Sequence, residues 1–211
     1  MLPVNKGIFI TFEGLDGCGK TTQSTMLYQY LRSLDIPVDL TREVGGTNAA
    51  ERVREILLYQ DLLPTSELLL IMAARYDHVH KRIKPKLEEG AWVICDRFVD
   101  STACYQGENQ EGYDKIYQLH AQIISLMPDI TFFIDVNPNL ALNRALQRGN
   151  NNKFEDRDFS FHQNCYNAFQ FILKKFPNRI VKIEATNLTI QQIHEEIVSI
   201  INAILVNDDK H

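Results

Sequence analysis

A run of eight residues near the amino terminus has the side chains and the spacing of a triphosphate-binding loop. It reads Gly14-Leu15-Asp16-Gly17-Cys18-Gly19-Lys20-Thr21 and matches the pattern G-x-x-x-x-G-K-[ST]. Glycines let the backbone curl so that several N–H groups converge on one phosphate oxygen. Lys20 adds a positive charge near the outer phosphates, and the Thr21 hydroxyl can bind Mg²⁺. The run therefore predicts a site for a nucleoside triphosphate.

The elements that must position this loop are present on both sides of it. Residues Ile8 to Phe12 form an apolar run typical of a buried strand. After the loop, five apolar residues recur at helical spacing: Met26, Leu27, Tyr30, Leu31 and Leu34. A helix that begins at the loop directs the positive end of its dipole toward bound phosphates. The order of strand, glycine loop and helix is what the motif requires.

Strand and helix signals alternate along the rest of the chain, which is typical of a parallel sheet wrapped by helices. Further strands are expected at residues 38–40, 92–96, 130–135 and 180–183. Helices are expected at about 48–59 and 190–206, and a long apolar helix is expected to begin at the caps Thr65 and Ser66. The pattern predicts one α/β domain over residues 1–206, with a flexible tail at 207–211.

Two carboxylates follow predicted central strands. Asp96 ends one apolar run and Asp135 ends another. Ligands of open α/β sheets bind beyond the carboxyl ends of the strands, so both side chains point toward the predicted site. Asp96 is the better partner for Thr21 in binding Mg²⁺, whereas Asp135 could equally be a capping or loop carboxylate.

Composition narrows the class of protein. The 211 residues are 45% hydrophobic and carry a net charge of -5, which argues against a polynucleotide partner. A secretory leader and a membrane-spanning apolar run are both missing, so a soluble cytoplasmic protein with no membrane partner is expected. The cysteines lack metal-ligand spacing and are expected to be small buried side chains: Cys18, Cys95, Cys104 and Cys165. Cys18, at a helix start, could have a lowered pKa and react with oxidants.

A triphosphate site is shared by GTPase switches, ATPase motors and small-molecule kinases. The sequence has no Asn-Lys-x-Asp motif for guanine, and motors are usually larger. A small-molecule kinase and a non-enzymatic nucleotide-binding switch remain. Motifs beyond the loop must separate them.

Those motifs resemble the thymidylate kinase family, in the nucleoside monophosphate kinase branch of the phosphate-loop proteins, over nearly the whole chain. They are the loop preceded by Phe12-Glu13, then Thr41-Arg42-Glu43, Gly45-Gly46-Thr47, Ala74-Arg75, Asp96-Arg97-Phe98, Asp100-Ser101-Thr102 and Tyr105-Gln106-Gly107. The resemblance implies a three-layer P-loop kinase fold with a five-stranded parallel sheet and a short lid at about 148–157. It also implies a homodimer that transfers the γ-phosphoryl group of ATP to dTMP with Mg²⁺, in dTTP synthesis. Another (deoxy)nucleoside monophosphate kinase is the alternative enzyme.

The resemblance further implies site residues. Those for dTMP are Asp16, Glu43, Arg54, Ile71, Arg75, Arg97, Thr102, Tyr105 and Gln106. Arg97 and Arg54 would grip the acceptor phosphate, although each could be a surface ion pair. Arg75, Thr102 and Gln106 would read the thymine, Tyr105 would contact the deoxyribose, and Asp16 with Glu43 would lie near the sugar hydroxyl and the metal. ATP would contact residues 14–21, with Arg144 packed on adenine. Gln106 could instead cap a turn, Tyr105 could be a core residue, and Arg144 could be solvated.

The chain departs from the family at three places. Val44 stands where proline is usual, and Ile71 stands where a phenylalanine stacks on thymine, which predicts a weaker grip on the base. The loop has Gly17-Cys18 where one subtype has an arginine, so the catalytic cation is expected from the lid. Alignment on Phe161 assigns this role to Lys153, with Arg148 and Arg157 as the alternatives.

Overall fold

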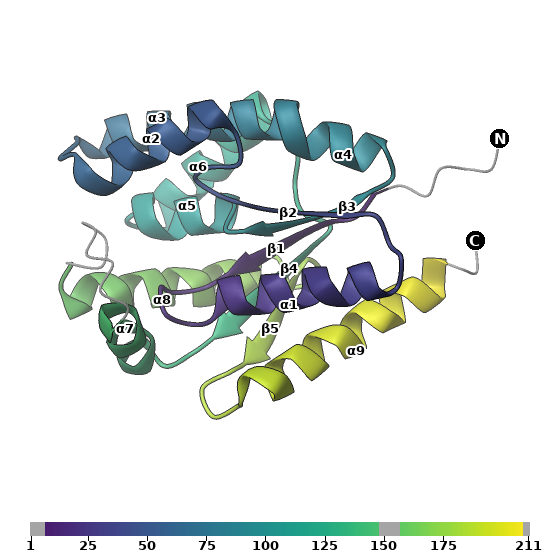
Figure 1. The fold of residues 1–211 in the computed structure, drawn as a ribbon. Helices are drawn as coiled ribbons and strands as arrows, with labels where there is room; N and C mark the ends of the chain where they lie inside the picture. The colour runs from purple at the N-terminus through teal and green to yellow at the C-terminus, as the bar shows by residue number, and fades with distance from the viewer. Residues whose placement is uncertain (1–6, 148–156, 209–211) are drawn as a thin grey trace.

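The computed structural model describes residues 7–147 and 157–208. Its five strands form one sheet in the order β2-β3-β1-β4-β5, with every neighbouring pair parallel (Figure 1). The strands are β1 (Phe9–Glu13), β2 (Val38–Arg42), β3 (Trp92–Asp96), β4 (Ile130–Asp135) and β5 (Ile180–Glu184). The predicted five-stranded parallel sheet is confirmed, and the predicted strand ends differ from the observed ones by no more than a few residues.

The central strand brings the functional segments together at one edge of the sheet. All five residues of β1 are buried, as expected for a strand paired on both sides. Phe12 lies opposite Asp96 in β3 and opposite Phe132 in β4. Because the strands are parallel, the glycine loop after β1 and the segment after β3 emerge side by side.

Helices cover both faces of the sheet. Alternate side chains of β1 point to opposite faces, and Phe9 and Glu13 contact Phe98 and Ser101 at the start of α5 (Val99–Gln106). Phe133 of β4 stacks on Phe169 of α8 (Phe159–Lys175). The opposite face is covered by α1 (Lys20–Ser33) and α9 (Ile190–Asp208), which lie against each other in Figure 1. The result is the predicted three-layer α/β arrangement.

The remaining described helices complete the layers on the sheet. They are α2 (Asn48–Tyr59), α3 (Pro64–His78), the π-helical turn η1 (Val79–Ile83), α4 (Lys84–Glu88), α6 (Gln110–Ile123) and α7 (Pro138–Gln147). The expectation that Thr65 and Ser66 cap α3 is wrong: the cap is Leu63, and Pro64 occupies the first turn, where its fixed φ suits a helix start. At the other end of the chain, α9 continues to Asp208, two residues into the segment expected to be a tail. Across the described ranges, no helix has both the length and the hydrophobicity to cross a bilayer.

Candidate active site

The phosphate-binding loop lies between the end of β1 and the start of α1. Gly19, just before the helix, has a φ of 104° and a ψ of 11°, in the left-handed region that disfavours side chains. Gly17 has a φ of 82° and packs on α7, where an added Cβ would lie 2.0 Å from the carbonyl oxygen of Ala141. The space beside Gly19 is open, because a Cβ there would meet no atom within 4 Å. The loop is thus supported by α7 on one side and leaves its backbone accessible to an anion on the other.

Two side chains of the loop turn into the protein core. Leu15 is 3% exposed and Cys18 is 2% exposed. The Lys20 Nζ donates to the Leu15 carbonyl oxygen at 2.7 Å and lies 3.8 Å from the Cys18 Sγ. Burial raises the pKa of the Cys18 thiol and outweighs the opposing effect of the Lys20 charge. The expectation of a lowered thiol pKa at this helix start is therefore wrong.

Thr21 and Asp96 meet where β1 and β3 end. The Thr21 hydroxyl donates to Asp96 Oδ2 at 2.5 Å. The other carboxylate oxygen, Asp96 Oδ1, is buried and has no hydrogen-bond partner among the described residues. Mg²⁺ prefers oxygen ligands and usually takes only one or two from the protein, with the rest from phosphates and water. The hydroxyl and the unpaired carboxylate oxygen fit such a site.

The Arg97 guanidinium is held by residues of the phosphate-binding loop and of α5. Its Nη2 donates to Asp16 Oδ1 at 2.6 Å, and its Nη1 donates to Ser101 Oγ at 2.8 Å and to the Gly14 carbonyl oxygen at 3.2 Å. The Tyr105 hydroxyl donates to the second Asp16 oxygen at 3.1 Å. Burial raises the pKa of Asp16, but positive charges, led by Arg97, outweigh burial and hold that pKa below its usual range. Asp16 therefore stays ionised and orients the arginine.

Glu13 contacts the residues that hold Arg97 in place. The Arg97 backbone has a φ of 71°, a conformation that few non-glycine residues adopt. Glu13 Oε1 accepts from the Phe98 N–H at 2.7 Å, and Glu13 Oε2 accepts from the Ser101 hydroxyl at 2.5 Å. Burial, followed by the nearby Asp100 charge, raises the pKa of Glu13 to about 8. Glu13 thus contacts the turn after Arg97 and the hydroxyl that receives its side chain.

Arg75 is fixed by two partners and keeps one nitrogen unpaired. It is 2% exposed, its Nε donates to Glu43 Oε2 at 2.5 Å, and its Nη2 donates to Thr102 Oγ1 at 2.7 Å. The guanidinium carbon lies 4.9 Å from the centroid of the Phe98 ring. The third nitrogen, Nη1, is buried without a hydrogen-bond partner among the described residues. Burial raises the pKa of Glu43, but the Arg75 charge outweighs it and lowers that pKa, so the pair is ionic. The peptide bond between Glu43 and Val44 is cis.

A cavity of about 170 Å³ opens beside Arg75. Its walls include every residue that the resemblance assigns to dTMP: Asp16, Glu43, Arg54, Ile71, Arg75, Arg97, Thr102, Tyr105 and Gln106. The other lining residues are four apolar side chains and one hydroxyl: Val44, Leu57, Leu58, Phe98 and Ser101. Arg54 is anchored by a hydrogen bond of 3.1 Å from Nη1 to the Val44 carbonyl oxygen. The cavity therefore combines apolar walls with a few convergent polar groups, as small-molecule sites do.

A second cavity, of about 630 Å³, borders the phosphate-binding loop. Its walls include Gly17, Gly19, Lys20, Thr21 and Asp96. Five residues line both cavities: Asp16, Glu43, Arg54, Leu58 and Arg97. The two spaces therefore adjoin at a boundary that carries two arginines and two carboxylates.

Two other predicted residues, Arg144 and Asp135, lie away from these cavities, as does Thr186. Arg144 is exposed on α7, the helix that supports Gly17, and lines neither cavity. Asp135 is 4% exposed and forms an ion pair with Lys182 at 2.8 Å, which is a structural role. In the loop after β5, the Thr186 hydroxyl accepts a hydrogen bond from a backbone N–H at 3.0 Å.

Of the three cations expected in the lid, Arg148 and Lys153 lie outside the described residues. Arg157 is described and exposed, with its guanidinium carbon 5.4 Å from the centroid of the Phe161 ring. The Phe161 ring in turn meets the Tyr105 ring edge to face, with 5.9 Å between centroids. Arg157 is therefore one aromatic ring away from the wall of the smaller cavity.

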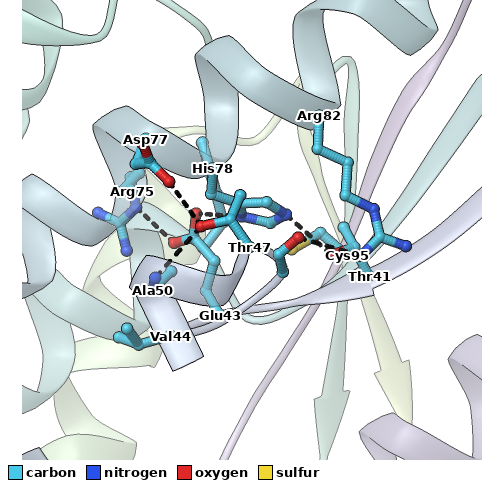
Figure 2. Close-up of polar contacts among 12 residues, drawn as sticks. Thr41, Glu43, Val44, Thr47, Ala50, Arg75, Asp77, His78, Arg82 and Cys95 are labelled. Carbon is cyan, nitrogen blue, oxygen red and sulfur yellow. Dashed lines mark hydrogen bonds and ion pairs between the residues drawn. The ribbon is translucent and has the colours of Figure 1, made fainter. Parts of the chain in front are cut away.

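Sequence reasoning missed several residues that shape the site. Ser101 lies in the first turn of α5 and Arg97 lies before that helix, so no helical spacing revealed their contact. His78 follows Arg75 by three residues on the same helix and contacts Glu43, as Figure 2 shows. Glu13 served only as a family marker. Its role could not be read from spacing, because its partners lie 85 and 88 residues further along the chain.

The fold and the two cavities define a class of protein. The phosphate-binding loop follows the central strand of an all-parallel sheet, where ligands of such folds bind. A second cavity adjoins it, and two arginines lie at the boundary, as the transfer of a phosphoryl group between two bound molecules requires. This arrangement is that of a phosphate-loop nucleotide kinase.

Comparison with known proteins gives the particular family. The family model described as thymidylate kinase matches residues 12–197, and the chain belongs to the thymidylate kinase family. The thymidylate kinase of Rickettsia bellii (strain RML369-C) is 54% identical over 206 residues, which are 97% of this chain and 100% of that protein. The thymidylate kinase of Rickettsia typhi is 55% identical over 197 residues, which are 92% of this chain and 97% of that protein. A crystal structure of thymidylate kinase from Ehrlichia chaffeensis matches with a TM-score of 0.76 and 40% identity, covering 92% of this chain and 98% of that one.

Proposed function

We propose that the protein transfers the γ-phosphoryl group of ATP to dTMP at the boundary between the two cavities, giving dTDP and ADP. As a member of the thymidylate kinase family, it is a kinase that acts on dTMP. The observation that carries the proposal for the residues is the shared boundary, to which Arg54 and Arg97 both contribute. Phosphoryl transfer depends on alignment and on stabilising charge spread over the transferred group. Two guanidinium groups between donor and acceptor supply both.

The smaller cavity is the proposed dTMP site. A thymine edge offers carbonyl acceptors and one N–H donor. Arg75 Nη1 is a buried donor without a partner among the described residues, which suits one of those carbonyl oxygens. Thr102 and Gln106 lie in the same wall, and Ile71 supplies apolar contact to the ring. An unpaired donor is costly to bury, so a ligand carbonyl at this position is favoured.

The sugar and the acceptor phosphate are assigned to the boundary. Tyr105 and Asp16 would contact the sugar, with the tyrosine ring crowding a 2′-hydroxyl and so favouring deoxyribose. Arg97 would hold the monophosphate with its planar fork while Asp16 and Ser101 keep the guanidinium oriented. Arg54 would add a second contact. The acceptor oxygen attacks the γ-phosphorus directly, so no covalent enzyme intermediate is needed.

The larger cavity is the proposed ATP site. The amides of residues 14–21 and the Lys20 ammonium would hold the phosphates, with Arg144 beside the adenine. Thr21 and Asp96 would hold Mg²⁺, which when bound neutralises charge on the donor phosphates. Enclosing both substrates excludes water that would otherwise hydrolyse ATP.

The remaining catalytic cation is assigned to the lid. Lys153 is the first candidate by alignment, and Arg148 and Arg157 are the alternatives. The contact of Arg157 with Phe161, whose ring meets Tyr105, supports a position near the site. Alanine at each position in turn tests the assignment. A sharp fall in turnover is expected for one of them, and full activity in all three variants contradicts it.

The assembly is proposed to be a homodimer in the cytoplasm. Large apolar side chains are exposed along α2, the α2–α3 connection and α3, and they would be covered in a dimer: Ile56, Tyr59, Leu63, Leu69 and Tyr76. The four cysteines are buried free thiols, which suits a reducing compartment. Sedimentation of the purified protein tests the dimer.

The proposed function is tested by a coupled ADP-release assay with ATP and Mg²⁺ across dTMP, dUMP, UMP, dCMP, AMP and GMP. The wild-type protein should prefer dTMP. Arg75→Lys keeps the positive charge beside Glu43 but loses the planar guanidinium with its several N–H donors. The KM for dTMP should therefore rise about tenfold or more. The matched control is Arg179→Lys, because Arg179 is similarly paired with a buried carboxylate, Asp100, but lines neither cavity. Preference for another acceptor contradicts the function, and an unchanged KM in Arg75→Lys contradicts the site.

A further inference from the structure

His78 is a buried histidine that lines neither cavity. Its side chain is 0% exposed, and it lies on α3 three residues after Arg75, so both side chains leave the same side of the helix. Figure 2 shows the imidazole lying between Glu43 and Thr41. His78 Nδ1 is 3.1 Å from Glu43 Oε1, and His78 Nε2 is 2.8 Å from Thr41 Oγ1. Both ring nitrogens therefore have polar partners.

The imidazole is held in one place by the backbone of the loop after β2. A Cβ added to Gly46 would lie 2.2 Å from His78 Nε2 and 2.7 Å from Thr41 Oγ1, so the bare glycine backbone packs directly on the ring. The Gly46 carbonyl oxygen accepts a hydrogen bond of 3.2 Å from Arg82 Nη1, which fixes the loop in turn. The ring cannot rotate without displacing this loop.

The contacts of Glu43 connect His78 to Arg75. One carboxylate oxygen of Glu43 accepts from Arg75 Nε, and the other faces His78 Nδ1. The carboxylate plane is therefore set by both neighbours. Without the imidazole, Glu43 Oε1 loses its partner and the carboxylate can turn. Arg75 then loses the fixed acceptor that, with Thr102, determines where Nη1 points.

Hydrogen-bond chemistry supports this chain of contacts. Glu43 is ionic beside Arg75, so it is an acceptor and His78 Nδ1 is the donor. In the neutral imidazole, His78 Nε2 then accepts from the Thr41 hydroxyl, and both ring nitrogens have a partner. A histidine is well suited here because it presents a donor and an acceptor on opposite sides of a rigid ring.

We propose that His78 is a positioning residue for thymine recognition: through Glu43 it fixes the orientation of the Arg75 guanidinium, and so the direction of Nη1 into the dTMP cavity. The inference rests on the proposed role of Arg75. It predicts that His78 affects the binding of dTMP and leaves the binding of ATP largely untouched. A purely structural role would predict a loss of folding that affects both substrates alike.

Two substitutions separate these roles. An asparagine amide occupies about the place of histidine Nδ1 and can still donate to Glu43, whereas a glutamine amide reaches the place of Nε2 and faces Thr41. His78→Gln should raise the KM for dTMP about fivefold, with the KM for ATP and kcat changing by less than about twofold. His78→Asn, although smaller, should recover most of that loss. The reverse order, with the larger glutamine closer to wild type, indicates packing alone and overturns the proposal.

Arg75→Lys in the same assay separates the failure of this inference from that of the proposed site. If Arg75→Lys raises the KM for dTMP and His78→Gln does not, this inference is wrong and the Arg75 assignment stands. If Arg75→Lys leaves that KM unchanged, the Arg75 assignment fails and this inference fails with it. In the double variant, the combined effect should be smaller than the product of the two single effects, because both act through one contact chain. Should His78→Gln fail to fold, Thr41→Val removes the second anchor of the ring at equal volume. It should raise the KM for dTMP about twofold, and an unchanged KM overturns the proposal.

Discussion

Replacing Ile71 by phenylalanine should lower the KM for dTMP. Ile71 lies on α3 one turn before Arg75, is 6% exposed and lines the smaller cavity. Two aromatic rings in the same wall are already engaged by arginines: Phe98 lies 4.9 Å from the Arg75 guanidinium carbon, and Tyr105 lies 5.0 Å from that of Arg97. Position 71 is therefore the place where an additional ring could stack on the base.

The size of the effect follows from the contact that is added. An aromatic pair contributes about 0.5 to 1.5 kcal/mol beyond buried area, so the KM for dTMP should fall about 2- to 12-fold. Overpacking a closed core costs roughly 1 to 3 kcal/mol of stability. Because Ile71 borders a cavity of about 170 Å³, the ring can extend into free space, and the free energy of unfolding should change by less than about 1 kcal/mol.

The assay is coupled ADP release, with dTMP varied at saturating ATP and ATP varied at saturating dTMP. Only the KM for dTMP should fall. Ile71→Leu is the matched control, because it keeps an aliphatic side chain of the same size. A folded Ile71→Phe protein with an unchanged or higher KM for dTMP would refute the reasoning. An equal fall in Ile71→Leu would show that aromaticity is not the cause.

Three further predictions concern the loop, the metal and the support of Arg97. Asp96→Asn removes a charged oxygen ligand, so the Mg²⁺ concentration for half-maximal activity should rise, and an unchanged requirement in a magnesium titration contradicts the metal assignment. Burial raises the pKa of Glu13 from 4.5 to about 8. Between these pH values the folded protein keeps a proton on Glu13 that the unfolded chain has released. The free energy of unfolding therefore falls as the pH rises through this range. In Glu13→Gln, the free energy of unfolding measured by urea denaturation should depend less on pH between about pH 5.5 and about pH 8.5. If this pH dependence is the same as in the wild-type protein, another group is responsible. Burial raises the pKa of the Cys18 thiol, so N-ethylmaleimide should label it at least about tenfold more slowly in the native protein than in the unfolded chain, as peptide mass spectrometry can measure; rapid native labelling rules this out.

The sequence by itself determined the elements and the edge of the sheet where ligands bind. Strand and helix periodicities depend on local spacing, and the motif residues follow directly after strands. The parallel sheet therefore brings the loop after β1 next to Asp96 and Arg97 without further information. The residues that resemblance assigned to dTMP come from five separate segments, and they line one cavity.

Only the tertiary structure decided which buried polar groups became partners. Glu13 reaches Ser101, and Glu43 is shared by Arg75 and His78, across separations of 88, 32 and 35 residues. Such pairs depend on where different elements place their backbones, which spacing along one element does not specify. The Cys18 thiol shows the same limit: its helix-start position predicts a lowered pKa, but packing of the surrounding core buries it and raises the pKa instead. Sequence motifs and the family resemblance selected the residues at the site, and burial by distant parts of the chain set their partners and charges.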